Sequence, residues 1–145
     1  MAILDLAMTE LHWRIPAARD EGLDAVGQLT NIVEALALFH TYRTELALLG
    51  ASEMRAIEGP DRTRIVDLRN DIQHMLDRAI AAGIRAGEFS TPYPHEAGRA
   101  IATMCTALPQ WFRAHGPVSR QQLAAEYAGF ALDIVRGGRA HPSAG

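Results

Sequence analysis

The residues able to do chemistry in this sequence are few, and they do not lie at the spacings that metal sites or catalytic centres need. The 145 residues contain six histidines and a single cysteine, Cys105, and these do not cluster as zinc ligands do. A di-iron bundle needs two Glu-x-x-His motifs, whereas the nearest match is one Asp71-x-x-His74 on a polar face. Cys105 has apolar neighbours within a predicted helix, where a reactive thiolate is disfavoured.

Motifs for phosphate binding and acyl transfer are also absent from the sequence. It contains neither a glycine-rich phosphate loop nor a G-x-S-x-G nucleophile elbow. We therefore predict that the chain is not an enzyme, and that it has no catalytic residue, no metal site and no cofactor.

Two polar residues do stand out, because they fall on the apolar stripe of a predicted helix. His40 and Arg43 continue the stripe of Leu36 at steps of three and four. A buried arginine is costly unless an anion or a carboxylate lies beside it. Either the two residues contact a ligand, or His40 is an ordinary core histidine and Arg43 pairs with Glu45 or Asp71.

The composition is that of one ordinary globular domain. Hydrophobic residues make up 48% of the chain and charged residues 21%, which is enough apolar material for one core. The net charge of −3 argues against a nucleic-acid surface on this chain. No apolar run reaches the roughly 20 residues that span a bilayer, and the first residues lack a signal-peptide pattern. The single cysteine excludes an internal disulfide, so we expect a cytoplasmic protein that does not contact membranes.

The elements that must position these residues are all predicted to be helices. Apolar residues recur at steps of three and four, and strand-like alternation is absent. We predict an all-α fold, an orthogonal bundle of about six helices, over residues 1–138, followed by a loose tail over 139–145. The predicted helices cover about 2–15, 23–43, 45–57, 60–86, 93–114 and 119–136.

Prolines and glycines set several of these boundaries. Pro16 is expected to stop the first helix, and Pro109 to kink the fifth, because proline cannot donate a backbone hydrogen bond. Gly87 is a predicted left-handed cap, after which Phe89 can fold back over the last turn of the fourth helix. Gly83 lies within that helix, so either something approaches it closely or the glycine is simply tolerated.

The last two predicted helices are apolar on more than one face, which a single small domain does not cover. We therefore expect a second copy of the chain to cover them through a two-fold, four-helix contact. Ser119 and Gln122 form a predicted capping box at the start of the last helix. The residues expected at the dimer contact are Thr103, Ala107, Gln110, Leu123, Tyr127, Ala131 and Ile134.

Three motifs in a fixed order resemble the C-terminal half of TetR-type transcriptional regulators. They are AAGIRAGEF, a helix ending in PQWFRAHGP, and the final helix SRQQLAAEYAGFALDIVRGG. In that family a helix ends in a glycine-phenylalanine turn, the next helix ends in paired aromatics like Trp111-Phe112, and the last carries a tyrosine like Tyr127. The resemblance runs from the first helix to about Gly138. It implies a homodimer formed by the last two helices.

The DNA-binding unit of that family, a helix-turn-helix of about fifty residues, is not matched in this sequence. The segment AILDLAMTELHWRI resembles the helix that follows that unit. The resemblance therefore implies DNA binding, and a role as a repressor, only for a parent protein with an additional N-terminal domain.

The resemblance also implies a pocket for a small effector among the long helices. The segments HTYRTELALLGASEMRAI and GPDRTRIVDLRND are similar to regulators of lipid, steroid and acyl-CoA catabolism, which implies an apolar metabolite such as an acyl-CoA or a fatty acid. The alternatives are a dimerisation scaffold without a ligand and, less favoured, a small helical-bundle enzyme. The expected ligand contacts are Met8, Leu36, His40, Arg43, Ile72, Met75, Met104, Leu108 and Trp111.

Overall fold

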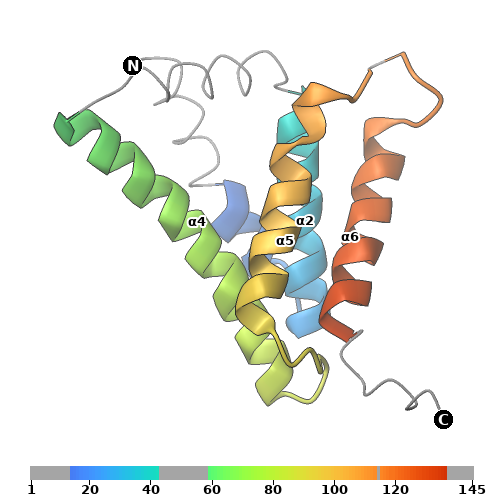
Figure 1. The fold of residues 1–145 in the computed structure, drawn as a ribbon. Coiled ribbons are helices and arrows are strands. Elements are labelled where there is room, and N and C mark those ends of the chain that lie inside the picture. Colours follow the sequence, from blue (N-terminus) through green and yellow to red (C-terminus); the bar gives the residue numbers. More distant parts are fainter. Residues whose placement is uncertain (1–13, 43–58, 114, 137–145) are drawn as a thin grey trace, which may run out of the picture.

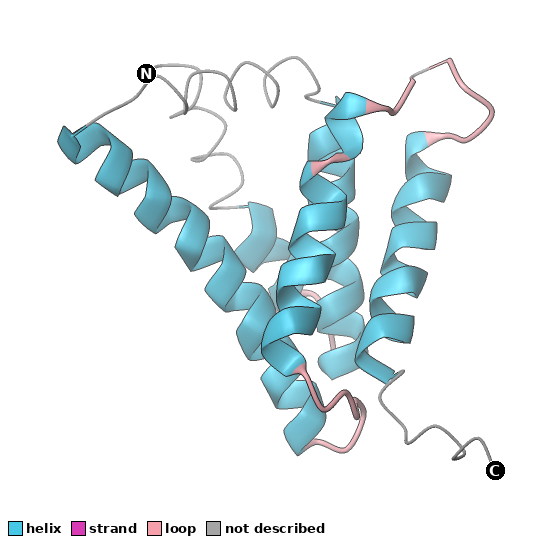
Figure 2. Ribbon diagram, viewed as in Figure 1, coloured by secondary structure: helices cyan, strands magenta, loops and turns pink. Residues whose placement is uncertain are grey.

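A computed structural model of the chain describes residues 14–42, 59–113 and 115–136, and every regular element within them is a helix (Figures 1 and 2). This confirms the predicted all-α class. The predicted helix over 45–57 and the tail over 139–145 lie outside the described residues. No described helix combines the length and the apolar character that crossing a membrane requires. The helices are a segment over 14–20, α2 (Ala25–Tyr42), α4 (Gly59–Arg85), α5 (Pro94–Thr106), the 3-10 helix η1 (Leu108–Gln110) and α6 (Arg120–Arg136).

Helix α2 lies at the centre and packs against α4, α5, η1 and α6 (Figure 1). Its predicted inward stripe is confirmed, because Leu29, Val33 and Leu36 are all buried. Ala37 and Phe39 are buried as well, so α2 is covered on several sides, as a helix with more than one apolar face must be.

The apolar core forms two clusters along α2. The main cluster joins α2 to α4, α5 and the C-terminal half of α6, and a smaller cluster lies where η1 meets the start of α6. Helix α6 packs closely on α2, because the side facing α2 carries small residues such as Ala124, Ala128 and Ala131, all buried. Small side chains let two helix axes approach and bury both backbones.

The turn after α4 confirms the predicted glycine cap. Gly87 has a φ of 77°, a conformation that glycine adopts at little cost. The backbone N–H groups of Glu88 and Phe89 donate to the Gly83 carbonyl at 2.8 and 3.1 Å, which closes the helix end. The Phe89 ring lies on Gly83, where any Cβ atom would overlap it. Gly83 is therefore required by a close neighbour, and is not simply tolerated.

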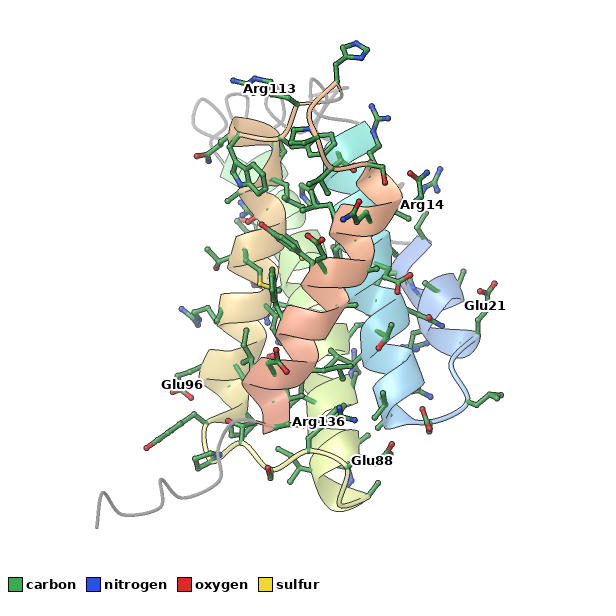
Figure 3. All side chains as sticks on the ribbon, turned by 90° about the vertical axis from the view of Figure 1, so that its right-hand side faces the viewer. Arg14, Glu21, Glu88, Glu96, Arg113 and Arg136 are labelled. Atoms are coloured by element: carbon green, nitrogen blue, oxygen red, sulfur yellow. The ribbon has the colours of Figure 1, made fainter. Side chains whose placement is uncertain are left out.

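The same turn also binds the ends of two other helices. The backbone N–H groups of Ser90 and Thr91 donate to the Val135 carbonyl at 3.0 and 2.9 Å, at the end of α6. A carboxylate oxygen of Glu88 accepts the Ala25 N–H at 3.3 Å, at the start of α2. Figure 3 shows Glu88 and Arg136 at the same end of the molecule, opposite Arg113.

At the opposite end, Arg120 connects α6 to α2. Its Nε donates to the Thr41 carbonyl at 3.2 Å, and its guanidinium lies 5.9 Å from the centre of the Phe112 ring. The predicted cap of α6 is confirmed on its serine side, since Ser119 Oγ accepts the Gln122 N–H at 3.1 Å. The Gln122 side chain itself donates to Glu126 in the next turn.

Two predicted boundaries were wrong, and both concern prolines. Residues 14–20 are helical, so Pro16 lies within a helix and does not end one, since its fixed φ is compatible with a helix; residues 2–13 of the predicted first helix lie outside the described residues. Helix α5 ends at Thr106, not near residue 114, and the chain continues into η1. Pro109 cannot donate to the Cys105 carbonyl, so the backbone tightens and Gln110 donates to the Ala107 carbonyl at 3.0 Å.

The close contact between Gly83 and Phe89 predicts an unusual response to alanine. In an exposed helix, glycine to alanine gains about 1 kcal/mol. We expect Gly83→Ala to lower the free energy of unfolding by about 1–3 kcal/mol instead, because the added methyl group displaces the Phe89 ring. Gly129→Ala in α6 is the control, since a Cβ there meets nothing within 4 Å. Denaturant unfolding measures both, and equal stabilisation by the two variants would contradict the expected packing.

Candidate functional site

His40 is a buried polar side chain among the predicted ligand contacts that the structure describes. It lies in the last turn of α2, with 6% of its surface exposed. Its Nδ1 is 2.8 Å from the Leu36 carbonyl oxygen, and its ring meets the Phe39 ring edge to face, with centroids 5.3 Å apart. A carbonyl oxygen can only accept, so Nδ1 carries the hydrogen and the neutral ring presents its lone pair at Nε2.

Burial lowers the pKa of His40, because the charged imidazolium would lose its hydration. The hydrogen bond to the Leu36 carbonyl opposes this change, and the positive charge of Arg69 on α4 lowers the pKa further. His40 is therefore neutral at pH 7.

Four apolar residues of the predicted ligand site lie together in the main core cluster. Leu36 of α2 and Met75 of α4 are buried, and Ile72 of α4 and Met104 of α5 are partly buried against them. Three helices thus contribute apolar side chains, flexible methionines among them, to the cluster that contains Leu36 and Phe39, the two residues that His40 contacts.

The other predicted ligand contacts are placed differently. Leu108 is fully buried, but in the smaller cluster with Ala37 and Phe112. Trp111 follows η1 and is 52% exposed, so it lies at the surface and not in the core. Met8 and Arg43 lie outside the described residues.

The groups considered for catalysis are placed as the sequence indicated. Burial raises the pKa of the Cys105 thiol to about 12, so a thiolate does not form near neutral pH. Asp71 and His74 are exposed on α4. Across the parts of the chain that the structure describes, no three histidine, cysteine or acidic side chains lie close enough to hold a metal ion.

The residues predicted for the dimer contact do not share one surface. Leu123 and Ala131 are buried in the chain's own core, where α6 packs on α2, and are not available to a second copy. Thr103 and Gln110 are exposed. Ala107, Tyr127 and Ile134 are partly buried.

Tyr127 and Phe130 show which side of α6 faces outward. Burial raises the pKa of Tyr127, and the nearby Cys105 raises it further, so the phenol lies at the junction of α6 and α5. Phe130 is 51% exposed and contacts the Tyr127 ring, with centroids 5.7 Å apart. Leu123, predicted at the dimer contact, is buried, whereas Phe130 lies on the outward side of α6.

A polar cluster that the sequence reasoning missed fixes the crossing of α4 and α5. Asp77 accepts a hydrogen bond from Gln73 Nε2 at 3.1 Å and lies 4.0 Å from His95 Nδ1. The Asp77 carboxylate also occupies the space where a Cβ of Gly98 would lie. The signal in the sequence was the glycine within α5, which lets α4 approach.

Comparisons with known proteins agree on one family. The family model described as the tetracyclin repressor-like C-terminal domain matches residues 22–135. A regulatory protein in the tetR family from Rhodococcus RHA1 is 27% identical, with a TM-score of 0.86 over 97% of this chain and 73% of that one. No curated protein sequence matches the chain.

Two further solved structures share the fold at lower identity. The TetR family transcriptional regulator PfmR from Thermus thermophilus is 24% identical, with a TM-score of 0.83 over 96% of this chain and 74% of that one. AibR, solved in complex with isovaleryl coenzyme A and operator DNA, is 14% identical, with a TM-score of 0.77 over 95% of this chain and 73% of that one.

The lowered pKa of His40 predicts that acid destabilises the fold through this residue. Above its ordinary pKa of 6.5 both the folded and the unfolded chain carry a neutral ring. Below that value the unfolded chain takes up a proton that the buried ring resists, so the free energy of unfolding falls as the pH falls. His40→Gln should reduce this slope between about pH 7 and pH 5.

Denaturant unfolding at a series of pH values measures the slope. His74→Gln is the matched control, the same substitution at an exposed histidine on α4. A His40→Gln slope equal to that of the wild type would show that another group carries the acid sensitivity.

Proposed function

The chain belongs to the TetR family of transcriptional regulators through its C-terminal domain, and on that premise we propose that it is the effector-sensing and homodimerisation domain of a repressor. Members of this family are regulators without enzymatic activity, so the chain is not an enzyme. In this proposal DNA is bound only through an additional N-terminal domain of the parent protein, and the protein acts in the cytoplasm.

The observation that carries the sensing proposal is the setting of His40. One buried imidazole contacts Leu36 and Phe39, which belong to the apolar cluster that Met75 of α4 and Met104 of α5 also join. Binding sites for small molecules combine apolar walls with a few polar groups that fix the orientation of the ligand. Flexible methionine side chains adapt to a bound apolar chain.

The proposed effector is an apolar metabolite of the acyl-CoA or fatty-acid class. The complex of AibR with isovaleryl coenzyme A supports acyl-CoA as the first compound class to test, because AibR has the same fold. A ligand that binds one arrangement of the helices better than another shifts the population towards that arrangement. In the dimer such a shift alters the spacing of two DNA-binding domains.

The dimerisation proposal places the contact on the outward sides of α5 and α6. Phe130 is a large aromatic side chain that lies half-exposed, and Thr103 and Gln110 are exposed on the neighbouring helix and η1. A second copy would remove this apolar surface from water in an interface of upward of ~1,200 Å². Phe130 is the proposed central residue of the contact, and Ala131, which the sequence predicted there, is left out because it lies in the core.

Effector binding is tested by the thermal stability of the chain in the presence of isovaleryl coenzyme A, longer acyl-CoA thioesters and fatty acids. A ligand at 100 times its dissociation constant should add about 2.7 kcal/mol to the free energy of unfolding. Leu36→Trp should abolish this gain, because the larger side chain fills the site. Leu38→Trp is the control on the same helix, where the side chain packs against the smaller cluster. If no compound stabilises the wild type, the domain is a dimerisation scaffold.

The dimer is tested by replacing the exposed aromatic residue of α6. We expect Phe130→Arg to give monomers in sedimentation velocity, because two guanidinium groups would be brought together in an apolar contact. Ala125→Arg is the control, an exposed position on another side of α6, and should remain dimeric. A Phe130→Arg protein that sediments as the wild-type dimer would place the interface elsewhere.

A further inference from the structure

The second ring nitrogen of His40 is a buried hydrogen-bond acceptor. Nδ1 is engaged by the Leu36 carbonyl at 2.8 Å, which leaves the lone pair on Nε2. Among the residues that the structure describes, none forms a hydrogen bond with Nε2, and only 6% of the His40 surface is exposed. Buried polar atoms in proteins normally have a partner, so an acceptor in this state indicates that something other than the described chain supplies the donor.

Neighbouring groups keep Nε2 in its acceptor form. Burial opposes protonation of the ring, and the positive charge of Arg69 opposes it as well. Thr41, the next residue, shows the contrast, because its hydroxyl lies within hydrogen-bond distance of both the Ala37 and Leu38 carbonyls, at 3.0 and 3.1 Å. The polar group of Thr41 is thus satisfied by its own helix, whereas that of His40 is only half satisfied.

We infer that Nε2 of His40 accepts a hydrogen bond from an uncharged N–H or O–H group of the effector, and so selects effectors that carry such a donor beside their apolar part. The inference rests on the proposed sensing function and narrows it. A coenzyme A thioester carries amide N–H groups next to its acyl chain. An ionised fatty acid offers only acceptors, so its carboxylate faces the lone pair of Nε2 without a proton between them.

The expected difference in affinity between effectors follows from the state in which an effector without a donor leaves Nε2 of His40. An apolar compound without a donor displaces water from the site and leaves Nε2 unpaired in an apolar setting. Sites built around a buried polar group reject analogues that lack the matching group much more strongly than analogues that differ by a methylene. We expect at least a tenfold difference in affinity between a matched donor and a non-donor.

The test compares 1-octanol with octyl methyl ether, in which a methyl group replaces the hydroxyl hydrogen and the donor is lost. It also compares isovaleryl coenzyme A with octanoate. Isothermal titration of the wild-type chain should give at least tenfold tighter binding of the alcohol than of the ether, and of the thioester than of octanoate. His40→Leu should bind alcohol and ether equally. His74→Leu is the matched control on the exposed side of α4 and should retain the preference.

Two outcomes would overturn the inference and leave effector sensing intact. One is equal binding of alcohol and ether by the wild type, and the other is a preference that survives in His40→Leu. Where the leucine variant does not fold, His40→Phe provides the same comparison, because a ring remains beside Phe39. If none of the four compounds binds the wild type, the sensing function and the inference fail together.

Discussion

The fold depends on the burial of α2 between α4, α5 and α6. A helix with apolar residues on several sides is stable only when each side is covered, and α2 meets a different neighbour on each. The closest neighbour is α6, whose Ala124, Ala128 and Ala131 bring the two backbones together. That contact uses the small-residue side of α6 within one chain, and it leaves the Phe130 side facing outward.

Most of the fold could be predicted from periodicity and end signals. The inward stripe of α2 and the cap at Gly87 are local properties of the sequence, and the structure confirms them. At Gly83 the sequence left a close approach and a tolerated glycine open, and the structure shows the Phe89 ring against it. The prolines were misjudged, because a proline removes one hydrogen bond but does not fix what the chain does next. The helix over 14–20 continues through Pro16, whereas α5 ends before Pro109.

The candidate site could be predicted less completely. The helical spacing of the apolar residues placed Leu36, His40, Met75 and Met104 on inward faces. In the structure these residues lie in or beside one core. The spacing could not tell which of the two apolar faces of α6 packs within the chain, so Leu123 and Ala131 were assigned to the wrong side. Both faces are equally apolar in sequence, and only the packing of α2 decides between them. The free lone pair of His40 depends on tautomer and partner, which no sequence pattern encodes.

The turn over residues 83–91 has a consequence for how this domain tolerates change. It joins the end of α4 to the start of α2 and the end of α6, and most of its hydrogen bonds run from backbone to backbone. Such a joint requires glycine at 83 and 87 and a ring at 89, and the hydroxyls at 90 and 91 add to it: Ser90 Oγ donates to the Arg136 carbonyl, and Thr91 Oγ1 accepts the Tyr93 N–H. Because backbone groups make most of these bonds, the connection between the three helix ends depends on few side chains.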